Sequence, residues 1–550
     1  MSVVPSTAFV GRAVAALVAA VLATGAQVFA GVIHVPADAP TIQQAIDVAQ
    51  QGDTILVAPG TYTEAIQFDL EGVVVQSTGG PDVTIIDAGG AGPTVTVDFF
   101  GPFAGKALRG FTLTGGSGRS FRPLGEPTGL AGGGVFVASS GTLELSDCII
   151  TGNSVTSPTL GTWGGGVLVA GASQVTLIHC VVAGNSAGTG GSALHVEPDG
   201  CTLVAQDCSF TGNVTGSGAA AVELLKCSGS LTDCSITANS GDGVSRTWYG
   251  LSLLRCTFEG NTGWGYRHSG PGGADVTDCT FLGNGLGGAE LMTSAGGKIP
   301  FGDHFVRRCI FAGDSLVAYF VTSGNAIESC SFDGATLDSE SATKLKNCIL
   351  RDTVVIPGVG SAALQYRYCD VEGGASGPGN IDADPLWADP VAHDYHLLPG
   401  SPCINTGDPA SPLDADGSHA DMGAVPYEPW SDLGGGVTGT SGLPRLEGDG
   451  PLVGGQPVTL TLSGVTPRTA TIWLVGTSAL EAPFKGGTLW PAALLLLPGV
   501  VTDGTGTIAL SASWPVGVPP GQTIWAQTWF VDAAGPQGWA GSNGLRGTTP

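Results

Sequence analysis

Charged and aromatic residues that could bind or cleave a sugar chain gather between residues 246 and 307. They are Arg246, Trp248, Tyr249, Trp264, Tyr266, Arg267, His268, Asp303, His304 and Arg307. The faces of the four aromatic rings could stack on sugar rings. The arginines and histidines could neutralise a uronate or move a proton, which makes them candidates for catalysis. The alternative is ordinary packing of turn aromatics between neighbouring segments, with the charged residues on the surface.

A second group of candidates is acidic. Asp414, Asp416 and Asp421 are close in sequence, and Gly417 follows Asp416. Oxygen-rich Asp-x-Asp-Gly segments can hold Ca²⁺, although this spacing differs from that of the twelve-residue EF-hand loop. The same residues also suit a turn in which Asp and Gly make local hydrogen bonds. We therefore expect no required cofactor, and Ca²⁺ stays open as a ligand.

Ten cysteines each lie in the same short phrase, apolar–x–x–Cys–x–apolar–x–Gly–Asn, with some variation. They are Cys148, Cys180, Cys208, Cys234, Cys256, Cys279, Cys309, Cys330, Cys348 and Cys369. Successive members are 18 to 32 residues apart, and Asn ends each of the first six copies. A repeat of this length with a strand-like pattern predicts a solenoid with one coil per repeat.

The spacing within the phrase favours strands. Cys and the apolar residue at +2 point the same way on a strand, because side chains alternate. The apolar residue at −3 has the opposite parity, so it reaches the same interior only if the chain bends before the Cys. Stacked coils should place Phe258, Phe281, Phe311 and Phe332 in one internal row, with equivalent residues about 4.8 Å apart.

We expect the stacked cysteines to be buried thiols. In-register neighbours lie slightly too far apart for a disulfide, whose Cβ atoms prefer roughly 3.5–4.5 Å. The alternative is a secreted disulfide framework. Cys201 and Cys227 should also stack, and a pairing of Cys403 with Cys369 stays open. The Asn residues that end the phrase predict a structural ladder of amides.

The first 30 residues predict export. They contain one charge, Arg12, followed by an apolar run, and they end in small residues before Ala30. This is typical of a Sec-type signal peptide cleaved after Ala30. The alternative is a membrane anchor, for which the apolar run is short. We therefore expect a secreted or cell-surface protein whose mature chain has no membrane span.

The chain is acidic, with 20 Lys and Arg against 46 Asp and Glu, and a net charge of −26. Such a surface repels nucleic acid and anionic lipid, so we expect no nucleic-acid partner. The negative charge also disfavours a polyanionic substrate, unless a divalent cation bridges the substrate and the protein. A simpler explanation is that the acidity keeps a secreted protein soluble.

The remaining sequence divides into three parts after the signal peptide at residues 1–30. Residues 31–428 are the predicted solenoid with its caps, 429–443 a flexible Gly-rich linker, and 444–550 a small antiparallel β-sandwich. The last part has four strand-like runs at 458–462, 470–475, 507–511 and 523–530, separated by turns. A more continuous apolar run at 489–498 indicates a buried strand or an interface.

A short helix is predicted at the N-terminal end of the solenoid. Thr41 and Gln44 have capping-box spacing, and Gly52 can end the helix in the left-handed conformation. Such a helix is needed because the first coil would otherwise expose its core and strand edges.

The predicted solenoid resembles the right-handed parallel β-helix, or pectin-lyase-like, superfamily. Its start at residues 33–64, the Cys phrase and the segments at 401–408 and 414–428 are similar to motifs of secreted bacterial members. The resemblance implies an all-β fold but not one activity, because the superfamily includes lyases, hydrolases, epimerases and adhesins. The Asn-Thr-Asp, Asp-Asp and Gly-His-Gly motifs of its polygalacturonases do not occur here.

The sequence therefore favours a secreted or surface-displayed β-helix without a recognisable catalytic motif. Its predicted role is to bind a polysaccharide or cell-surface glycan, or to serve as a structural surface protein. The alternative is a polysaccharide lyase or glycoside hydrolase that uses the residues between Arg246 and Arg307. The P-loop and His-Glu-x-x-His motifs are absent from the sequence.

Overall fold

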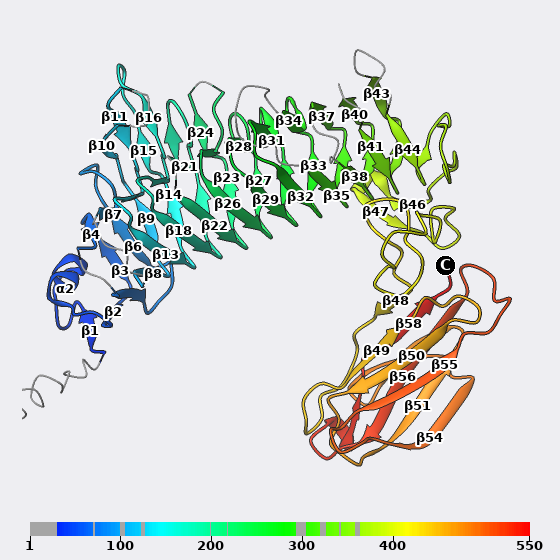
Figure 1. The fold of residues 1–550 in the computed structure, drawn as a ribbon. Coiled ribbons are helices and arrows are strands. Elements are labelled where there is room, and N and C mark those ends of the chain that lie inside the picture. The colour runs from blue at the N-terminus through cyan, green and yellow to red at the C-terminus, as the bar shows by residue number, and fades with distance from the viewer. Residues whose placement is uncertain are drawn as a thin grey trace, which may run out of the picture. The chain divides into compact units, whose positions relative to one another are not determined.

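Three long parallel sheets wind the chain into a β-helix solenoid, and antiparallel sheets follow toward the C-terminus (Figure 1). The computed structural model describes residues 30–69, 72–98, 105–122, 127–197, 200–216, 218–292, 304–319, 326–339, 343–357 and 364–550. Residues 1–29, which hold most of the predicted signal peptide, are therefore outside the described part. The chain forms two compact units, Met1–Cys227 and Ser228–Pro550.

In the first unit each sheet gains one strand per coil. One sheet contains β1 (Val32–Val35), β2 (Thr54–Val57), β5 (Val74–Ser77), β8 (Ala107–Arg109), β13 (Thr142–Ser146), β18 (Gln174–Ile178) and β22 (Thr202–Gln206). The second contains β3 (Gly60–Tyr62), β6 (Thr84–Asp87), β9 (Thr112–Thr114), β14 (Ile149–Thr151), β19 (Val181–Ala183) and β23 (Ser209–Thr211). The third contains β4 (Ile66–Gln67), β7 (Val95–Asp98), β12 (Val135–Ala138), β17 (Val167–Val169), β21 (Leu194–Val196) and β25 (Val222–Leu225).

The same three-sheet coil recurs in the second unit. The first sheet there contains β26 (Ser228–Thr232), β29 (Leu251–Leu254), β32 (Ala274–Thr277), β35 (Phe305–Arg307), β38 (Ala326–Glu328), β41 (Lys344–Lys346) and β44 (Gln365–Arg367). The second contains β27 (Ser235–Thr237), β30 (Thr257–Glu259), β33 (Thr280–Leu282), β36 (Ile310–Ala312), β39 (Ser331–Asp333), β42 (Ile349–Arg351) and β45 (Asp370–Val371). The third contains β28 (Val244–Thr247), β31 (Trp264–Ser269), β34 (Gly287–Met292), β37 (Ser315–Tyr319), β40 (Thr336–Ser339) and β43 (Val354–Pro357).

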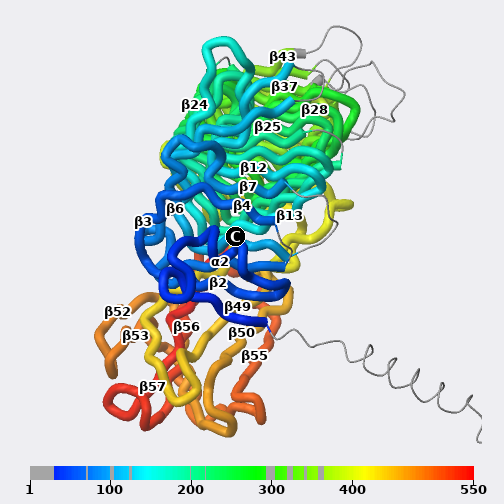
Figure 2. The backbone as a smooth tube through the Cα atoms, turned by 90° about the vertical axis from the view of Figure 1, so that its left-hand side faces the viewer, coloured from blue at the N-terminus to red at the C-terminus, as the bar shows by residue number. Residues whose placement is uncertain are grey.

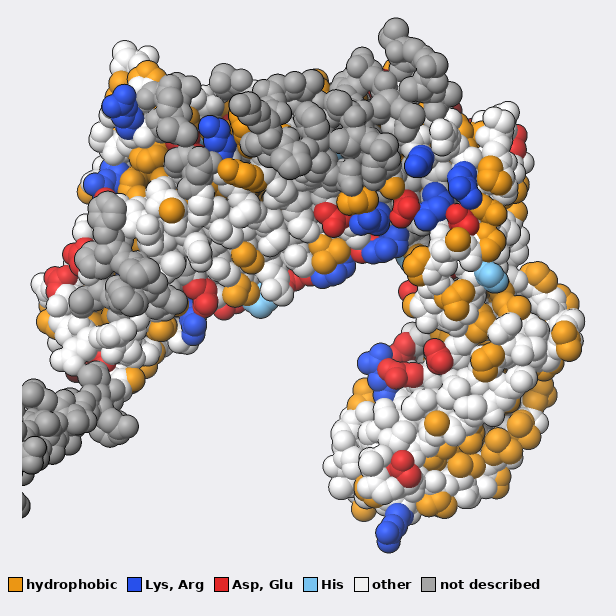
Figure 3. Space-filling view, viewed as in Figure 1, with side chains coloured by type: hydrophobic (Ala, Val, Ile, Leu, Met, Phe, Trp, Pro, Cys, Tyr) orange, Lys and Arg blue, Asp and Glu red, His pale blue; other side chains and the backbone are white. Residues whose placement is uncertain are grey.

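The predicted bend lies at the residue that precedes each phrase cysteine. All ten of these residues have positive φ angles: Asp147, His179, Asp207, Asp233, Arg255, Asp278, Arg308, Ser329, Asn347 and Tyr368. One left-handed residue turns the chain from the first sheet into the second, so the apolar residue at −3 and the Cys both face the interior. Several of these corner residues pair along the outside. Arg255 donates to both carboxylate oxygens of Asp233, each at 2.6 Å, and Figure 3 shows acidic and basic side chains adjacent along this edge.

The interior consists of rows of identical residues, as the repeat predicts. Phe258, Phe281, Phe311 and Phe332 stack nearly parallel, with successive ring centroids 4.9, 4.8 and 5.1 Å apart. All 13 cysteines are buried free thiols, which confirms the expectation that the stacked cysteines are buried thiols. Cys369 and Cys403 are among them, so these two are not paired. Because the strand spacing sets the ring spacing, stacking adds to the hydrophobic burial of each phenyl group.

The asparagines form the predicted ladder. In the second unit, Asn261 Oδ1 accepts from the backbone N–H and the Nδ2 of Asn239 at 3.2 and 3.0 Å. Asn261 Nδ2 donates in turn to Ile236 O and to Asn284 Oδ1, each at 2.9 Å. Asp314 ends the row by accepting from Asn284. Each buried amide thus satisfies backbone groups that the turn leaves without strand partners.

A short helix packs at the N-terminal end, as predicted. Helix α2 (Ile42–Val48) begins after Thr41, whose hydroxyl accepts from Gln44 N at 3.2 Å. It contacts β1, β2 and β4 (Figure 2). One detail is corrected: the helix ends at Val48, and Gly52 takes its left-handed φ of 94° in the turn that follows. The extended Ala49 interrupts the helix before it reaches the glycine.

The first unit carries an extra layer outside its third sheet. Strands β10 (Arg119–Phe121), β11 (Gly129–Ala131) and β16 (Thr162–Trp163) form a small sheet, and Trp163 packs with Phe136 and Leu168 in a second apolar cluster. On the same outer row as Phe136 and Leu168 lies His195, which is fully buried. A histidine buried on this row needs charged partners to stay protonated.

Two glutamates supply those partners. His195 Nδ1 lies 3.0 Å from Glu223 Oε2, its register neighbour on β25, and His195 Nε2 lies 3.5 Å from Glu197 Oε1. Burial by itself lowers the pKa of His195, but the hydrogen bonds and charges of the two glutamates outweigh burial and raise the pKa to about 9. The imidazole is therefore charged at neutral pH.

The C-terminal part is an antiparallel β-sandwich. One sheet orders β48 (Trp430–Asp432), β58 (Leu545–Thr548), β56 (Thr523–Val531), β51 (Ala470–Gly476) and β54 (Leu495–Val501), and β57 (Trp539–Gly541) pairs with β56. The other sheet orders β49 (Arg445–Asp449), β50 (Pro457–Ser463) and β55 (Ile508–Ser513). A hairpin of β52 (Ala479–Phe484) and β53 (Gly487–Pro491) lies beside β56. The core includes the fully buried Trp473.

Two expectations for this part need correction. The segment 429–443 is not a free linker, because Trp430–Asp432 pairs with β58 and Val437 bridges to Gly541. The Trp430 indole fixes this strand by donating from Nε1 to Gly450 O at 2.9 Å. The apolar run at 489–498 is not a buried strand, because it is divided between β53 and the edge strand β54, whose Leu496 is 58% exposed. The alternative, that the run is part of an interface, stays a prediction.

We expect replacement of Asn261 by Ala to destabilise the solenoid by on the order of 3 kcal/mol, because buried backbone and amide groups on both sides lose their partners. Glu259→Ala, at an exposed position of the same coil, is the matched control. Chemical unfolding followed by circular dichroism measures the difference. Equal unfolding midpoints for the two variants would contradict a stabilising role of the ladder.

The His195 cluster predicts that the protein loses stability at alkaline pH. Because the folded pKa is raised from 6.5 to about 9, the stabilisation is complete below pH 6.5 and is lost as pH rises through 9. A shift of this size corresponds to roughly 3 kcal/mol. The unfolding midpoints of the wild type and His195→Gln, measured from pH 6 to 9.5, should converge as pH increases. A constant difference between the two midpoints would show that His195 does not titrate in this pH range.

Candidate functional site

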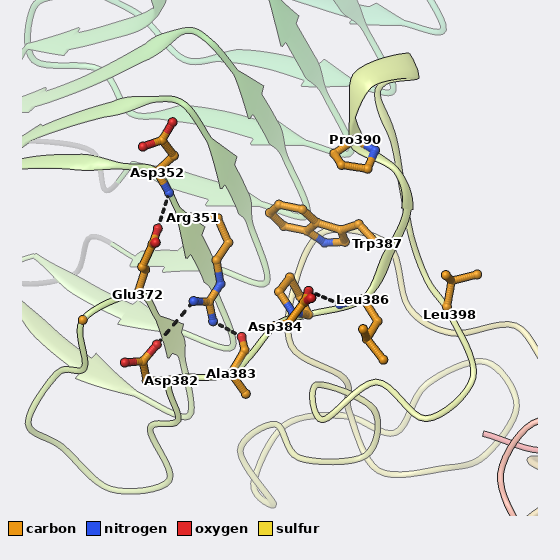
Figure 4. Close-up of a pocket in the computed structure, with 12 residues that line it drawn as sticks. Arg351, Asp352, Glu372, Asp382, Ala383, Asp384, Leu386, Trp387, Pro390 and Leu398 are labelled. Carbon is orange, nitrogen blue, oxygen red and sulfur yellow. Dashed lines mark hydrogen bonds and ion pairs between the residues drawn. The ribbon is translucent and has the colours of Figure 1, made fainter.

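An open cleft of about 1040 Å³ lies where the solenoid ends (Figure 4). Asp352, Glu372 and Asp382 lie on one side of Arg351, and the apolar side chains lie on the other side, where Asp384 is next to Leu386. The lining side chains include Arg351, Asp352, Glu372, Asp382, Asp384, Leu386, Trp387, Pro390 and Leu398. The cleft exists because the chain after β45 leaves the regular coil and forms β46 (Trp387–Asp389) and β47 (Asp394–Leu397) as an antiparallel pair.

Arg351 at the end of β42 holds the floor of the cleft together. Its guanidinium binds the carboxylate of Asp370 and the carbonyl oxygen of Ala383, and its Nη1 lies 3.4 Å from Asp382 Oδ1. Asp370 is fully buried, and its Oδ1 also accepts from Ala383 N at 3.0 Å. Burial by itself lowers the pKa of Arg351, but the two aspartates outweigh burial and raise it. The guanidinium therefore stays charged and cannot serve as a base.

Four carboxylates surround this arginine and face solvent. Asp352, Glu372, Asp382 and Asp384 are all exposed. Glu372 Oε2 accepts from the backbone N–H of Asp352 at 2.7 Å, and Asp384 Oδ1 accepts from Leu386 N at 2.9 Å. These bonds orient the acidic groups along the cleft, where they can accept hydrogen bonds from the hydroxyl groups of a sugar.

The opposite side is built around Trp387. Its ring packs edge-on against Tyr395, with centroids 4.9 Å apart and planes at 88°. Tyr395 is itself anchored, because its hydroxyl donates to Asp333 Oδ2 at 2.9 Å. Pro390 and Leu398 extend the apolar side. An indole fixed in this way offers a flat apolar surface for a sugar ring.

The structure divides the residues predicted as one cluster into a buried group and a surface group. Arg246, Tyr266, His268 and His304 are fully buried inside the solenoid. The His268 and His304 rings are 5.0 Å apart. Burial and neighbouring positive charge lower the pKa of His268 to about 3 and that of His304 to about 4, and burial raises the pKa of Tyr266 to about 12. The interior position keeps a polysaccharide from these side chains, which corrects the expectation of a single exposed site.

The other members of that predicted cluster lie on the surface in separate places. Trp248 and Tyr249 are 40% and 43% exposed in the turn before β29. Arg267 faces outward from β31 and lies 2.5 Å from Glu290 Oε2. Trp264, from the same strand, is partly exposed. Side-chain alternation explains the separation, because Tyr266 and His268 point inward on β31 and Arg267 points outward.

Arg307 lies on a different sheet from Arg267. Its guanidinium covers the ring of Phe305, 4.1 Å from the centroid, and lies 3.6 Å from Asp275 and 3.7 Å from Glu328. Asp303 is outside the described residues. Sugar binding by the exposed aromatics and catalysis by the two arginines therefore stay predictions.

The three aspartates predicted to hold a metal act as turn acceptors. Asp414 Oδ2 accepts from Asp421 N at 2.9 Å, and Asp416 Oδ1 accepts from Ser418 N at 2.9 Å. Asp421 accepts from two backbone N–H groups. Burial raises the pKa of Asp414 to about 6 and that of Asp421 to about 7. Within the described ranges, no group of three or more Asp, Glu, His or Cys side chains is arranged to hold a metal ion. Calcium binding stays a prediction.

Sequence reasoning missed the cleft. Glu372, Asp382 and Trp387 lie in the stretch where the cysteine phrase is lost, and Arg351 lies just after Cys348. The one available signal was the change in composition after residue 371 to Asp-, Pro- and His-rich sequence, which indicated closing coils. It did not indicate that these side chains meet.

Comparison with known proteins supports the fold. Residues 165–313 match a family model described as a right-handed β-helix region; this part of the chain is a right-handed β-helix. No curated protein sequence matches the chain. No helix in the described part of the chain is long and apolar enough to cross a membrane.

Several solved structures are similar to the chain at low identity. A complex of XylC with xylose is 9% identical over 86% of this chain and 96% of that chain, with a TM-score of 0.35. The catalytic unit of a GH87 α-1,3-glucanase from Streptomyces thermodiastaticus is 13% identical over 62% of this chain and 64% of that one, with a TM-score of 0.32. The Dettilon tailspike protein is 11% identical over 94% of both chains, with a TM-score of 0.30. At these scores the likeness says nothing about the activity of this chain.

The buried ion pair predicts strong coupling between Arg351 and Asp370. We expect Arg351→Met to destabilise the protein by about 3–5 kcal/mol, because it leaves the buried Asp370 carboxylate without a cation. The double variant Arg351→Met with Asp370→Asn should recover part of this loss. Chemical unfolding of the two single variants and the double variant measures the coupling. Additive losses would contradict the pairing.

Proposed function

We propose that the protein acts on a polysaccharide. In this proposal the Arg351–Trp387 cleft holds the polysaccharide while one of its glycosidic bonds is hydrolysed. The observation that carries this proposal is the pairing, across one open cleft, of a fixed indole surface with several carboxylates. Glycoside hydrolysis requires two carboxyl groups that flank the scissile bond, one as acid and one as base or nucleophile. Glu372, Asp382 and Asp384 are the candidates for these roles.

A lyase reaction fits the cleft less well than hydrolysis. Lyases remove a proton from the sugar carbon that bears the carboxylate of a uronate. They need a base and a positively charged group that neutralises this carboxylate. Arg351 is the cation of the cleft, but its guanidinium is tied to Asp370, Asp382 and the carbonyl oxygen of Ala383. The exposed carboxylates would also repel a uronate.

A second candidate function is binding without cleavage. The observation that favours it is the exposure of all four carboxylates. A general acid at neutral pH usually needs a carboxyl group in an apolar environment, whereas exposed carboxylates suit hydrogen bonds to hydroxyl groups. Both functions require neutral sugars in the same cleft, and they differ in whether a product appears.

The purified chain from residue 31 to 550 should bind a neutral polysaccharide and release new reducing ends. We expect two of the variants Asp382→Asn, Asp384→Asn and Glu372→Gln to abolish product formation while binding changes by less than about threefold. Affinity gel electrophoresis measures binding, and a reducing-end assay measures product. Binding without product in the wild type would reject hydrolysis in favour of the second function.

Two variants at Trp387 test the cleft itself. Trp387→Leu keeps apolar packing against Tyr395 but removes the flat ring, so we expect affinity to fall about tenfold. Trp387→Phe retains an aromatic face and should keep most of the affinity. Wild-type affinity in the Leu variant, with unchanged unfolding, would move the sugar site away from this cleft.

A further inference from the structure

The outer face of the sandwich carries aromatic residues that its core does not use. Along β56, Ala526 and Phe530 point into the core, so Trp525, Gln527 and Trp529 point to the opposite face. The hairpin β52–β53 lies on this face and covers part of it (Figure 2). Trp529 is buried beneath it, whereas Trp525 is partly exposed.

Trp490 from the hairpin completes a pair of indoles. The Trp490 and Trp525 rings are 6.3 Å apart between centroids, and their planes differ by only 22°. Trp490 is also partly exposed. It lies directly over Gly544, where a Cβ atom would come within 2.1 Å of the indole. The absence of a side chain at Gly544 is therefore what lets the indole lie flat there.

Hydrogen bonds fix both rings. Trp490 donates from Nε1 to Gly434 O at 2.9 Å, and its backbone N–H donates to Gln527 Oε1 at 3.0 Å. Trp525 Nε1 lies 3.3 Å from Thr523 Oγ1. Since both indole N–H groups have partners within the sandwich, the exposed parts of the rings offer apolar faces at little cost in conformational entropy.

Arg546 lies next to these rings. It is the register partner of Trp525 on β58, and its guanidinium carbon is 6.0 Å from the Trp525 centroid. Its polar contact in the structure is Ser431 Oγ at 3.4 Å. Among the described residues no carboxylate lies within 4.0 Å of its guanidinium. Its Nε is buried, but its Nη nitrogen atoms can pair with a carboxylate from a ligand.

The charge of the sandwich suits such a ligand. Although the whole chain has a net charge of −26, residues 444–550 contain four basic and five acidic residues and are nearly neutral. A polyanion is therefore repelled much less by this domain than by the rest of the chain, and Arg546 supplies local attraction.

We propose that the Trp490–Trp525–Arg546 surface is a binding site for acidic polysaccharide, with two indoles that stack on sugar rings and a guanidinium that pairs with a uronate carboxylate. The site has a different ligand preference from the neutral-sugar cleft, and its existence does not depend on the function of that cleft. It gives the sandwich a role in attaching the protein to an acidic glycan.

Oligogalacturonate of six sugars is the probe, and cellohexaose is the neutral comparison. We expect the purified chain from residue 31 to 550 to bind oligogalacturonate, with affinity that falls as salt increases. Arg546→Gln should weaken this binding at least tenfold and remove its salt dependence. Trp525→Ala should weaken it by a similar factor, and Trp525→Phe should retain most of it. Isothermal titration calorimetry measures each affinity.

Two control variants separate this site from other surfaces. Arg445→Gln removes an exposed arginine of the same domain that pairs with Glu447 at 2.7 Å, and it should leave the affinity unchanged. Trp387→Leu should also leave oligogalacturonate binding unchanged, which distinguishes failure of the cleft from failure of this site. Absence of oligogalacturonate binding in the wild type would overturn the proposal. So would equal weakening by Arg445→Gln and Arg546→Gln, or equal affinity of folded Arg546→Gln and wild type.

Discussion

The constraint on which the structure depends is the stacking of equivalent residues at the spacing of neighbouring strands, about 4.8 Å. Each interior residue must pack against its counterparts in the coils on either side. Phenyl rings meet this condition as parallel stacks such as Phe281 on Phe311. Amides meet it by donating to the next amide, as Asn261 does to Asn284. One left-handed residue before each cysteine maintains the register from coil to coil.

The interior also accommodates polar residues when they lose their charge or acquire partners. His268 and His304 lie in contact inside the second unit, and burial favours their neutral forms. His195 lies in an equally buried place in the first unit, yet two glutamates favour its charged form. The same residue type thus has opposite charge states, because burial and nearby positive charge both favour the neutral form in one case, and carboxylates outweigh burial in the other.

Surface chemistry concentrates where the stacking rule no longer holds. After β45 the chain has no further coil to match, so it forms an antiparallel pair and a cleft anchored by Arg351 and Asp370. The sandwich follows a different pattern, in which one sheet face fills the core and the opposite face presents Trp525 beside Arg546. In both places the side chains are held by hydrogen bonds or packing, which leaves their outer surfaces for a ligand.

The sequence by itself determined the solenoid, its repeat and most of its interior. Periodicity is a local property, so Cys256, Phe258 and Asn261 could be assigned to the thiol row, the phenyl row and the amide ladder from their spacing alone. The sequence also indicated the capping helix and the strands of the sandwich. The tertiary structure decided which polar side chains reach solvent: it buried Arg246 and exposed Arg267. It alone brought Arg351 and Trp387 to one cleft, because contacts between irregular segments follow no repeat.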